Sequence, residues 1–201
     1  RFARELLTSS GSCFRTPQVN FYRAVNEPPP AALASAAALT FMGVRIESWP
    51  PARRAGFEKF FSRVAYKQTA EWKEEIVYCD PGAATPLHAV FPGGAEVVIP
   101  PERDPREVFA DWLIREDNPY FARAIVNRIW SWLLGRGLVA EADDIGPDNP
   151  PVHPGLLAFL EKKLTGSGYD LKHIFRIILN SHTYQQSSIP KTAGPEARAL
   201  F

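Results

Sequence analysis

Residues 118–134, NPYFARAIVNRIWSWLL, decide the fold class of the second half of this chain. Asn118-Pro119 is typical of a helix start, because proline has a helical φ and lacks an amide that would need a partner there. Apolar side chains then lie on nearly every side of the segment, and Gly135 follows at a position where glycine commonly ends helices. The pattern predicts a buried central helix over residues 120–134.

Three further helices are expected around this central one. Asp104-Pro105-Arg106-Glu107 predicts a helix start, with Asp104 as the cap and Glu107 reaching back to it. His153-Pro154 opens a second helix that ends near Gly166, and Asp170 caps a third. Each has one apolar face. Four amphipathic helices with short links predict a helical bundle.

The first half is divided by proline clusters, which end helices and central strands. Helices are expected over 2–7, 31–42 and 51–64. Residues 75–79 and 96–99 are β-type runs between Pro- and Gly-rich segments. The predicted fold class is therefore mainly α, a helical bundle with a short β hairpin or extended connector in the middle.

Composition excludes several classes of protein. The chain has 201 residues, 45% of them hydrophobic, and 23 Lys and Arg against 22 Asp and Glu. This share of hydrophobic residues is enough to form a buried core. The balanced charge does not favour nucleic acid as a partner. No apolar run approaches the ~20 residues of a membrane span. The first residue is Arg1, in what looks like a helix interior, so we expect a piece of a larger protein.

The two cysteines exclude the common cysteine-based sites. Cys13 and Cys79 do not form a Cys-x-x-Cys pair, so a zinc ribbon, a thioredoxin-type centre and a covalent haem all lack their ligands. A disulfide between the two remains open, because it depends on whether the protein is exported.

The central helix carries a few charged residues that need partners. An unpaired buried arginine costs several kcal/mol, and Asp143 and Asp144 follow the helix closely. We expect an Arg–Asp clasp that holds the 135–149 loop on the bundle, with Arg128 paired to Asp144. Arg128, Asp143 and Arg136 are the candidate binding residues.

A catalytic interpretation of the same region is the alternative. His153 opens a helix, where the dipole favours a neutral imidazole. With Asp144 beside it, His153 would act as a general base, so these two residues are the candidate catalytic pair. The competing interpretation is that His153 caps the free amides of its helix.

The loop over residues 143–149 is rich in oxygen ligands, which Ca²⁺ prefers. Its spacing is not that of an EF-hand, and Asp and Asn are common in turns. We favour the turn, and predict no metal site and no cofactor.

Longer motifs in the second half carry a family resemblance. Asn-Pro-Tyr-Phe-Ala-Arg-Ala-Ile-Val-Asn-Arg-Ile-Trp (118–130), Asn-Pro-Pro-Val-His-Pro-Gly-Leu-Leu (149–157) and Leu-Asn-Ser-His-Thr-Tyr-Gln (179–185) resemble the PSD domain of unknown function. That domain is known from large, usually exported proteins of planctomycetes and related bacteria. Leu-Leu-Thr-Ser-Ser-Gly-Ser (6–12) and Phe-Met-Gly-Val-Arg-Ile-Glu (41–47) resemble the tail of its companion, the PSCyt (planctomycete cytochrome-associated) domain.

The resemblance implies three regions and a location. Residues 1–70 are expected to be a PSCyt-like helical tail, 71–103 a connector, and 104–201 a PSD-like bundle. It also implies a periplasmic or extracellular location, and other domains of the full-length protein as partners, with an extracellular polymer as a further one.

One departure from the family pattern concerns haem. Many relatives continue after Gly-Val-Arg-Ile with a Cys-x-x-Cys-His segment, whereas this chain has Glu47-Ser48-Trp49-Pro50 there. The thioether and iron ligands are missing, so a haem role does not carry over. We therefore expect a non-catalytic structural or interaction module of a larger exported bacterial protein, without haem attachment. The alternative is a hydrolase-type domain, acting on carbohydrate, that uses Asp144 and His153.

Overall fold

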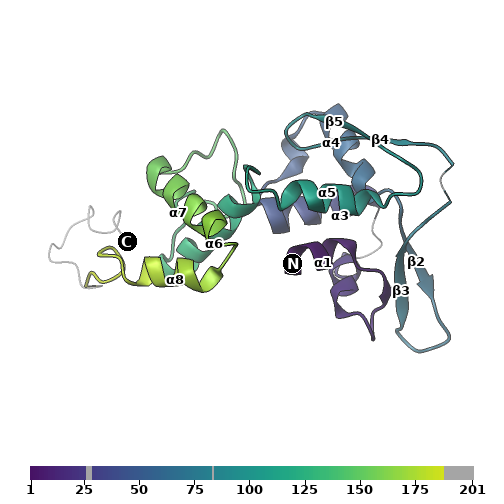
Figure 1. Cartoon of the computed structure of the whole chain (residues 1–201), viewed down its shortest axis with the longest axis horizontal. Coiled ribbons are helices and arrows are strands. Elements are labelled where there is room, and N and C mark those ends of the chain that lie inside the picture. Colours follow the sequence, from purple (N-terminus) through teal and green to yellow (C-terminus); the bar gives the residue numbers. More distant parts are fainter. Residues whose placement is uncertain (26–28, 83, 188–201) are drawn as a thin grey trace. The chain divides into compact units, whose positions relative to one another are not determined.

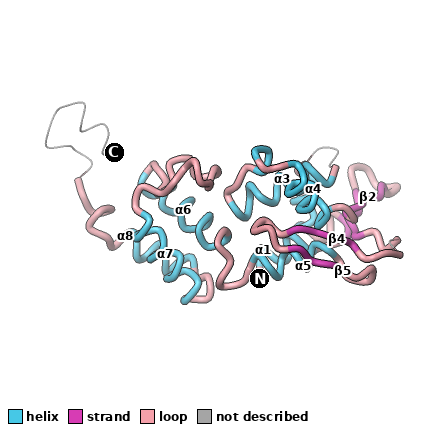
Figure 2. Tube along the Cα trace, turned by 90° about the horizontal axis from the view of Figure 1, so that it is seen from above, coloured by secondary structure: helices cyan, strands magenta, loops and turns pink. Residues whose placement is uncertain are grey.

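The structure is a computed structural model that describes residues 1–25, 29–82 and 84–187. Helix makes up 47% of the chain and strand 12%, which confirms the mainly helical class with some β structure. The chain forms two compact units (Figure 1): Arg1–Thr40 with Arg45–Asn118, and Phe41–Val44 with Pro119–Phe201. All the described strands belong to the first unit and are magenta in Figure 2.

The first unit contains the helices of the first half together with α5. They are α1 (Phe2–Thr8), α2 (Asn20–Arg23), α3 (Pro30–Ala37), α4 (Pro51–Glu58) and α5 (Pro105–Leu113), with 3₁₀ turns at η1 (Pro17–Val19), η3 (Ile46–Ser48) and η4 (Lys59–Phe61). α3 continues as one π-helical turn, η2 (Ala38–Met42). Gly43 follows with φ +63°, a left-handed conformation that glycine adopts without strain. The predicted helix over 31–42 therefore forms, with a change of helix type.

The predicted helix over 51–64 is wrong at its end. α4 ends at Glu58, one 3₁₀ turn follows, and Val64 begins a strand. Val64 lies opposite Cys79 in an antiparallel pair that continues to Gln68 and Glu75. Cross-strand pairing thus outweighs the helical spacing of the apolar residues before it.

Within the described residues, five short strands form two separate sheets. They are β1 (Gly11–Ser12), β2 (Val64–Gln68), β3 (Glu75–Cys79), β4 (Leu87–Val90) and β5 (Glu96–Ile99). The order is β1-β3-β2 in one sheet and β4-β5 in the other, all antiparallel. The two predicted strands, β3 and β5, form with the expected bounds. β3 pairs with both β1 and β2, and β5 pairs with β4, none of which the sequence predicted.

An aromatic core holds the first unit together. Phe57, Phe60 and Phe61 are fully buried, and their ring centroids lie 5.2, 5.6 and 5.7 Å from that of Phe109 in α5. These distances are typical of favourable aromatic pairs. α5, the first of the four helices expected after residue 104, therefore packs in the first unit, where it also contacts α1.

The second unit is built from α6 (Phe121–Leu134), α7 (Pro154–Gly166) and α8 (Leu171–Leu179). α6 and α7 begin and end within a residue or two of the predicted positions, and α8 begins directly after Asp170, as predicted. Their buried residues form one core with the segment after α6: Ala122, Val126, Ile129, Leu138, Val139, Leu157, Leu160, Leu164, Ile174 and Ile178.

The expectation that α6 is buried on every side is wrong. Trp132 is 72% exposed, although Asn127 and Val126 on the same helix are fully buried. α7 and α8 both contact α6, and together they cover one face of it. The apolar residues on the opposite face of α6, such as Trp132, are therefore not buried by α7 and α8.

Candidate functional site

Arg128 pairs with Asp143, the neighbour of the residue expected. Its Nε donates to Asp143 Oδ1 at 2.8 Å, and its Nη2 lies 2.6 Å from the same oxygen. The side chains are 21% and 46% exposed. An ion pair this open to water contributes about 0–1 kcal/mol. The clasp between α6 and the following loop exists, but the pairing of Arg128 with Asp144 is wrong.

Asp144 takes part in the loop through its backbone. Its carbonyl oxygen accepts from Asn149 Nδ2 at 3.0 Å, and its amide donates to Glu141 O at 3.1 Å. Gly146 and Asn149 form an isolated antiparallel bridge. The oxygen-rich loop is thus a hydrogen-bonded turn. Across 1–25, 29–82 and 84–187, no group of three or more His, Cys, Asp or Glu side chains is placed to hold a metal ion.

His153 stands at the N-cap of α7 but does not cap it. Its side chain makes no hydrogen bond to the free amides of the helix, and only its carbonyl oxygen accepts, from the Leu157 amide at 3.1 Å. The capping interpretation is therefore wrong. His153, Asp144 and Arg136 are all exposed. Within the described part of the chain, the Asp144 and His153 side chains join no ion pair or hydrogen bond, and the catalytic pair stays a prediction.

A fully buried polar contact of the second unit involves Asn127, which the sequence analysis gave no role. Its side chain is fully buried and forms hydrogen bonds with both the amide and the carbonyl of Val139. Nδ2 donates to Val139 O at 3.2 Å, and the Val139 amide donates to Oδ1 at 2.9 Å. Because Val139 is 1% exposed, these groups have no access to water. Asn127 therefore fixes the chain that leaves α6.

Gly137 makes this approach possible. A Cβ at this position would lie 2.2 Å from Val139 O and 3.0 Å from both polar atoms of the Asn127 side chain. No side chain fits there. Gly135, two residues earlier, ends α6 with φ +79°. Glycine is thus required at Gly135 by the left-handed backbone conformation and at Gly137 by the close approach of Val139 and Asn127.

Further contacts fasten the 135–153 loop and its helices. The Ile145 amide donates to Gly43 O at 2.7 Å, and the Val152 amide donates to Leu138 O at 2.8 Å. Arg123 Nε donates to Glu161 Oε1 at 2.7 Å, which links α6 to α7. These contacts hold the second unit together.

The first unit has a buried polar cluster of its own, centred on Arg106. The side chain is 2% exposed, and Nη2 lies 2.7 Å from Asp104 Oδ2. It also donates to Ser9 O at 3.2 Å and to Ser10 Oγ at 2.9 Å, and lies 5.4 Å from the Tyr22 ring centroid. A buried charge needs this degree of compensation. Asp104 also caps α5, where the Arg106 amide donates to it.

Titratable neighbours of this cluster are held in their neutral forms. Burial, with the nearby Asp104 charge adding to it, raises the pKa of the Cys79 thiol to about 11. Burial raises the pKa of Tyr66 to about 12 and raises that of Tyr22 as well. A thiol with so high a pKa is a poor nucleophile at neutral pH. Cys13 and Cys79 are both free cysteines, so the disulfide left open by the sequence does not form in the structure.

Two residues with structural importance were missed, and only one left a signal. Asn127 is a polar residue on the buried side of an apolar helix, a position that demands partners. Arg106 stands in the first turn of α5, where arginine is ordinary. Its partners Ser9 and Ser10 lie 97 and 96 residues away, so no local pattern points to them.

Comparison with known proteins bears on the second half of the chain. Residues 105–200 match the family model described as PSD1, protein of unknown function (DUF1553). No curated protein and no solved structure matches the chain. The matched range begins at α5 and takes in α6, α7 and α8, and it does not extend to the first half. Over residues 105–200, the protein is therefore similar to the PSD1 family, whose function is unknown.

Proposed function

We propose that this chain is a non-catalytic helical module of a larger exported bacterial protein, without haem attachment. The observation that carries the proposal is the use of polar side chains in the second unit. The buried amide of Asn127 and the paired cations Arg123 and Arg128 all fasten helices or the loop to one another. These three side chains are therefore used to hold the second unit together.

The family context extends this proposal to regions and partners. We take residues 1–70 as a PSCyt-like tail, 71–103 as a connector and 104–201 as a PSD-like helical bundle. These divisions follow motifs and are separate from the two compact units. Other domains of the same full-length protein are the proposed partners, with an extracellular polymer as a further one, in the periplasm or outside the cell.

The absence of haem attachment rests on the cysteines. Cys13 is buried, its Sγ lies 3.7 Å from Lys73 O, and it accepts from the Glu75 amide. Cys79 lies in β3 and is held as a neutral thiol. Neither is part of a Cys-x-x-Cys-His segment, which haem attachment requires.

Substitution of either predicted catalytic residue, Asp144 or His153, should leave the stability of the protein unchanged. We expect Asp144→Asn and His153→Gln each to alter the free energy of unfolding by less than about 0.5 kcal/mol, because both side chains are exposed and unpartnered in the described chain. Urea denaturation measures this. Asp148→Asn, the same change at an exposed position of the same loop, is the control.

The opposite result would favour the hydrolase alternative. Catalytic groups are often held at a cost to stability, so their removal can stabilise an enzyme. A gain of about 1 kcal/mol or more in Asp144→Asn, absent from Asp148→Asn, would count against a non-catalytic module. Hydrolysis of a polysaccharide by the unaltered chain, lost in Asp144→Asn, would refute it.

A further inference from the structure

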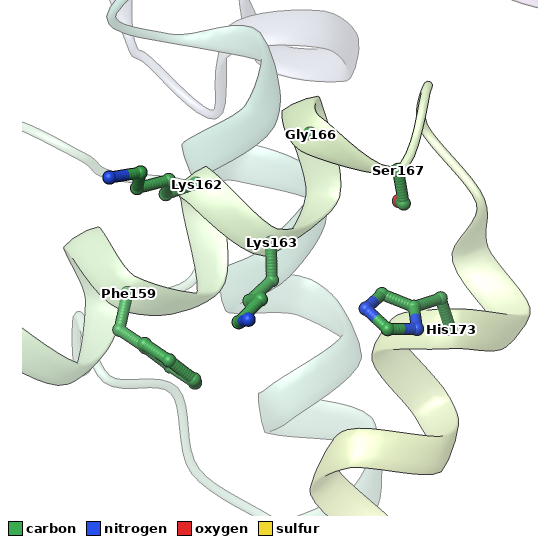
Figure 3. Close-up of a pocket in the computed structure, with 6 residues that line it drawn as sticks. All are labelled: Phe159, Lys162, Lys163, Gly166, Ser167 and His173. Atoms are coloured by element: carbon green, nitrogen blue, oxygen red, sulfur yellow. The ribbon is translucent and has the colours of Figure 1, made fainter.

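A cavity of about 560 Å³ lies in the second unit, away from the residues discussed so far. It is lined by residues of α7, of the turn that follows and of α8: Phe159, Lys162, Lys163, Gly166, Ser167 and His173. Small-ligand sites typically have volumes of about 300–1,000 Å³. Figure 3 shows the Phe159, Lys163 and His173 side chains directed into the same space, while Lys162 leaves the helix in another direction.

The lining of this cavity is rich in basic residues. Two lysines and a histidine contribute to it, and none of its lining residues is a carboxylate. The nearest acidic residues along the chain are engaged elsewhere. Glu161 pairs with Arg123, and Asp170 accepts from the Lys172 amide at the start of α8. A chain with a net charge of only +1 thus concentrates positive charge at one hollow.

An aromatic wall completes the cavity. Phe159 is 48% exposed, and Lys163 Nζ lies 5.4 Å from its ring centroid. The turn behind it is fixed, because Ser167 Oγ donates to Leu164 O at 2.9 Å and accepts from the Asp170 amide. A lysine in the last turn of α7 also complements the helix dipole. The helix dipole accounts for Lys163 alone. It does not account for the exposed Phe159 ring or for His173 on α8.

We propose that this cavity binds a carboxylate-bearing sugar of an acidic polysaccharide. The sugar ring packs on Phe159, and its carboxylate accepts from the Lys163 ammonium and from an imidazole N–H of His173, which donates in either protonation state. The proposal deepens the proposed function, on which it rests, by naming the class of extracellular polymer. A nucleic acid fits less well, because its binding surfaces are extended basic stripes with several aromatic residues.

The test is calorimetric titration of the full 201-residue chain with a tetramer of galacturonic acid. The methyl ester of the same tetramer keeps the rings and removes the charge. We expect the acid to bind and the ester to bind at least about tenfold more weakly. Lys163→Gln and Phe159→Ala should each weaken binding of the acid by about tenfold, whereas Lys172→Gln, an exposed lysine of α8 outside the cavity, should not.

Several results would overturn the proposal. These are no binding of the acid, equal binding of acid and ester, or equal losses in Lys163→Gln and Lys172→Gln. Tighter binding of a single-stranded oligonucleotide would assign the cavity to another class of ligand. Failure in any of these ways leaves the proposed function standing, because another face would then make the contact. Cleavage of the bound tetramer would instead keep the site and refute the non-catalytic module. Circular dichroism of each exposed-site variant confirms folding.

Discussion

Asn127→Leu is expected to lower the free energy of unfolding of the second unit by about 2–5 kcal/mol. Leucine has the same branching as asparagine and suits an apolar helix, so the change creates no large cavity. What it removes is the side chain that pairs with the Val139 amide and carbonyl, both of which are buried. Each unsatisfied buried group costs about 1–3 kcal/mol.

Urea denaturation followed by circular dichroism measures this loss. Asn180→Leu is the matched control, because Asn180 is an exposed asparagine whose amide donates to the Arg176 carbonyl at 2.8 Å. Its loss should be small, since water replaces the partner. Gly137→Ala should resemble Asn127→Leu, because a Cβ would meet the same groups. Similar losses for Asn127→Leu and Asn180→Leu would contradict this account of the loop.

Asp104→Asn is expected to destabilise the first unit by about 3–5 kcal/mol, the cost of leaving a buried charge without its partner. The Arg106 side chain is 2% exposed and Asp104 supplies its carboxylate. Its remaining acceptors, Ser9 O and Ser10 Oγ, are neutral. Asparagine can still cap α5, so the loss reports chiefly on the charge.

Two further variants separate the ion pair from general damage. Asp117→Asn removes the partner of Arg115, but these side chains are 69% and 60% exposed, so little change is expected. Asp104→Ala combined with Arg106→Met removes both charges and should recover much of the lost stability, because apolar replacements of buried pairs are often neutral. A double variant less stable than Asp104→Asn would contradict the proposed cost.

The elements predicted well from the sequence are those with local causes. Asp104 and Asp170 cap α5 and α8 through bonds to the amide two residues on, and Gly135 ends α6 in the left-handed conformation. Each signal lies within a few residues of its effect. The apolar spacing of α6, α7 and α8 is likewise local.

The features that were missed depend on partners far along the chain. β2 forms where a helix was predicted, because Val64 finds Cys79 across a sheet. Arg128 selects Asp143 over its neighbour Asp144 through the path of a loop, which the sequence does not specify. The apolar composition of α6 does not determine which of its faces is buried. It predicted burial on every side, yet Trp132 is exposed to solvent.

Native-state hydrogen exchange of the 138–152 loop tests most directly the claim that polar groups of the second unit serve to hold its fold. The Val139, Ile145 and Val152 amides donate to Asn127 Oδ1, Gly43 O and Leu138 O. We predict that all three exchange only in the slow, global opening that also exposes the interior amides of α6. Exchange of these amides at the rate of freely exposed loop residues would show a loop that opens on its own, and would contradict the account.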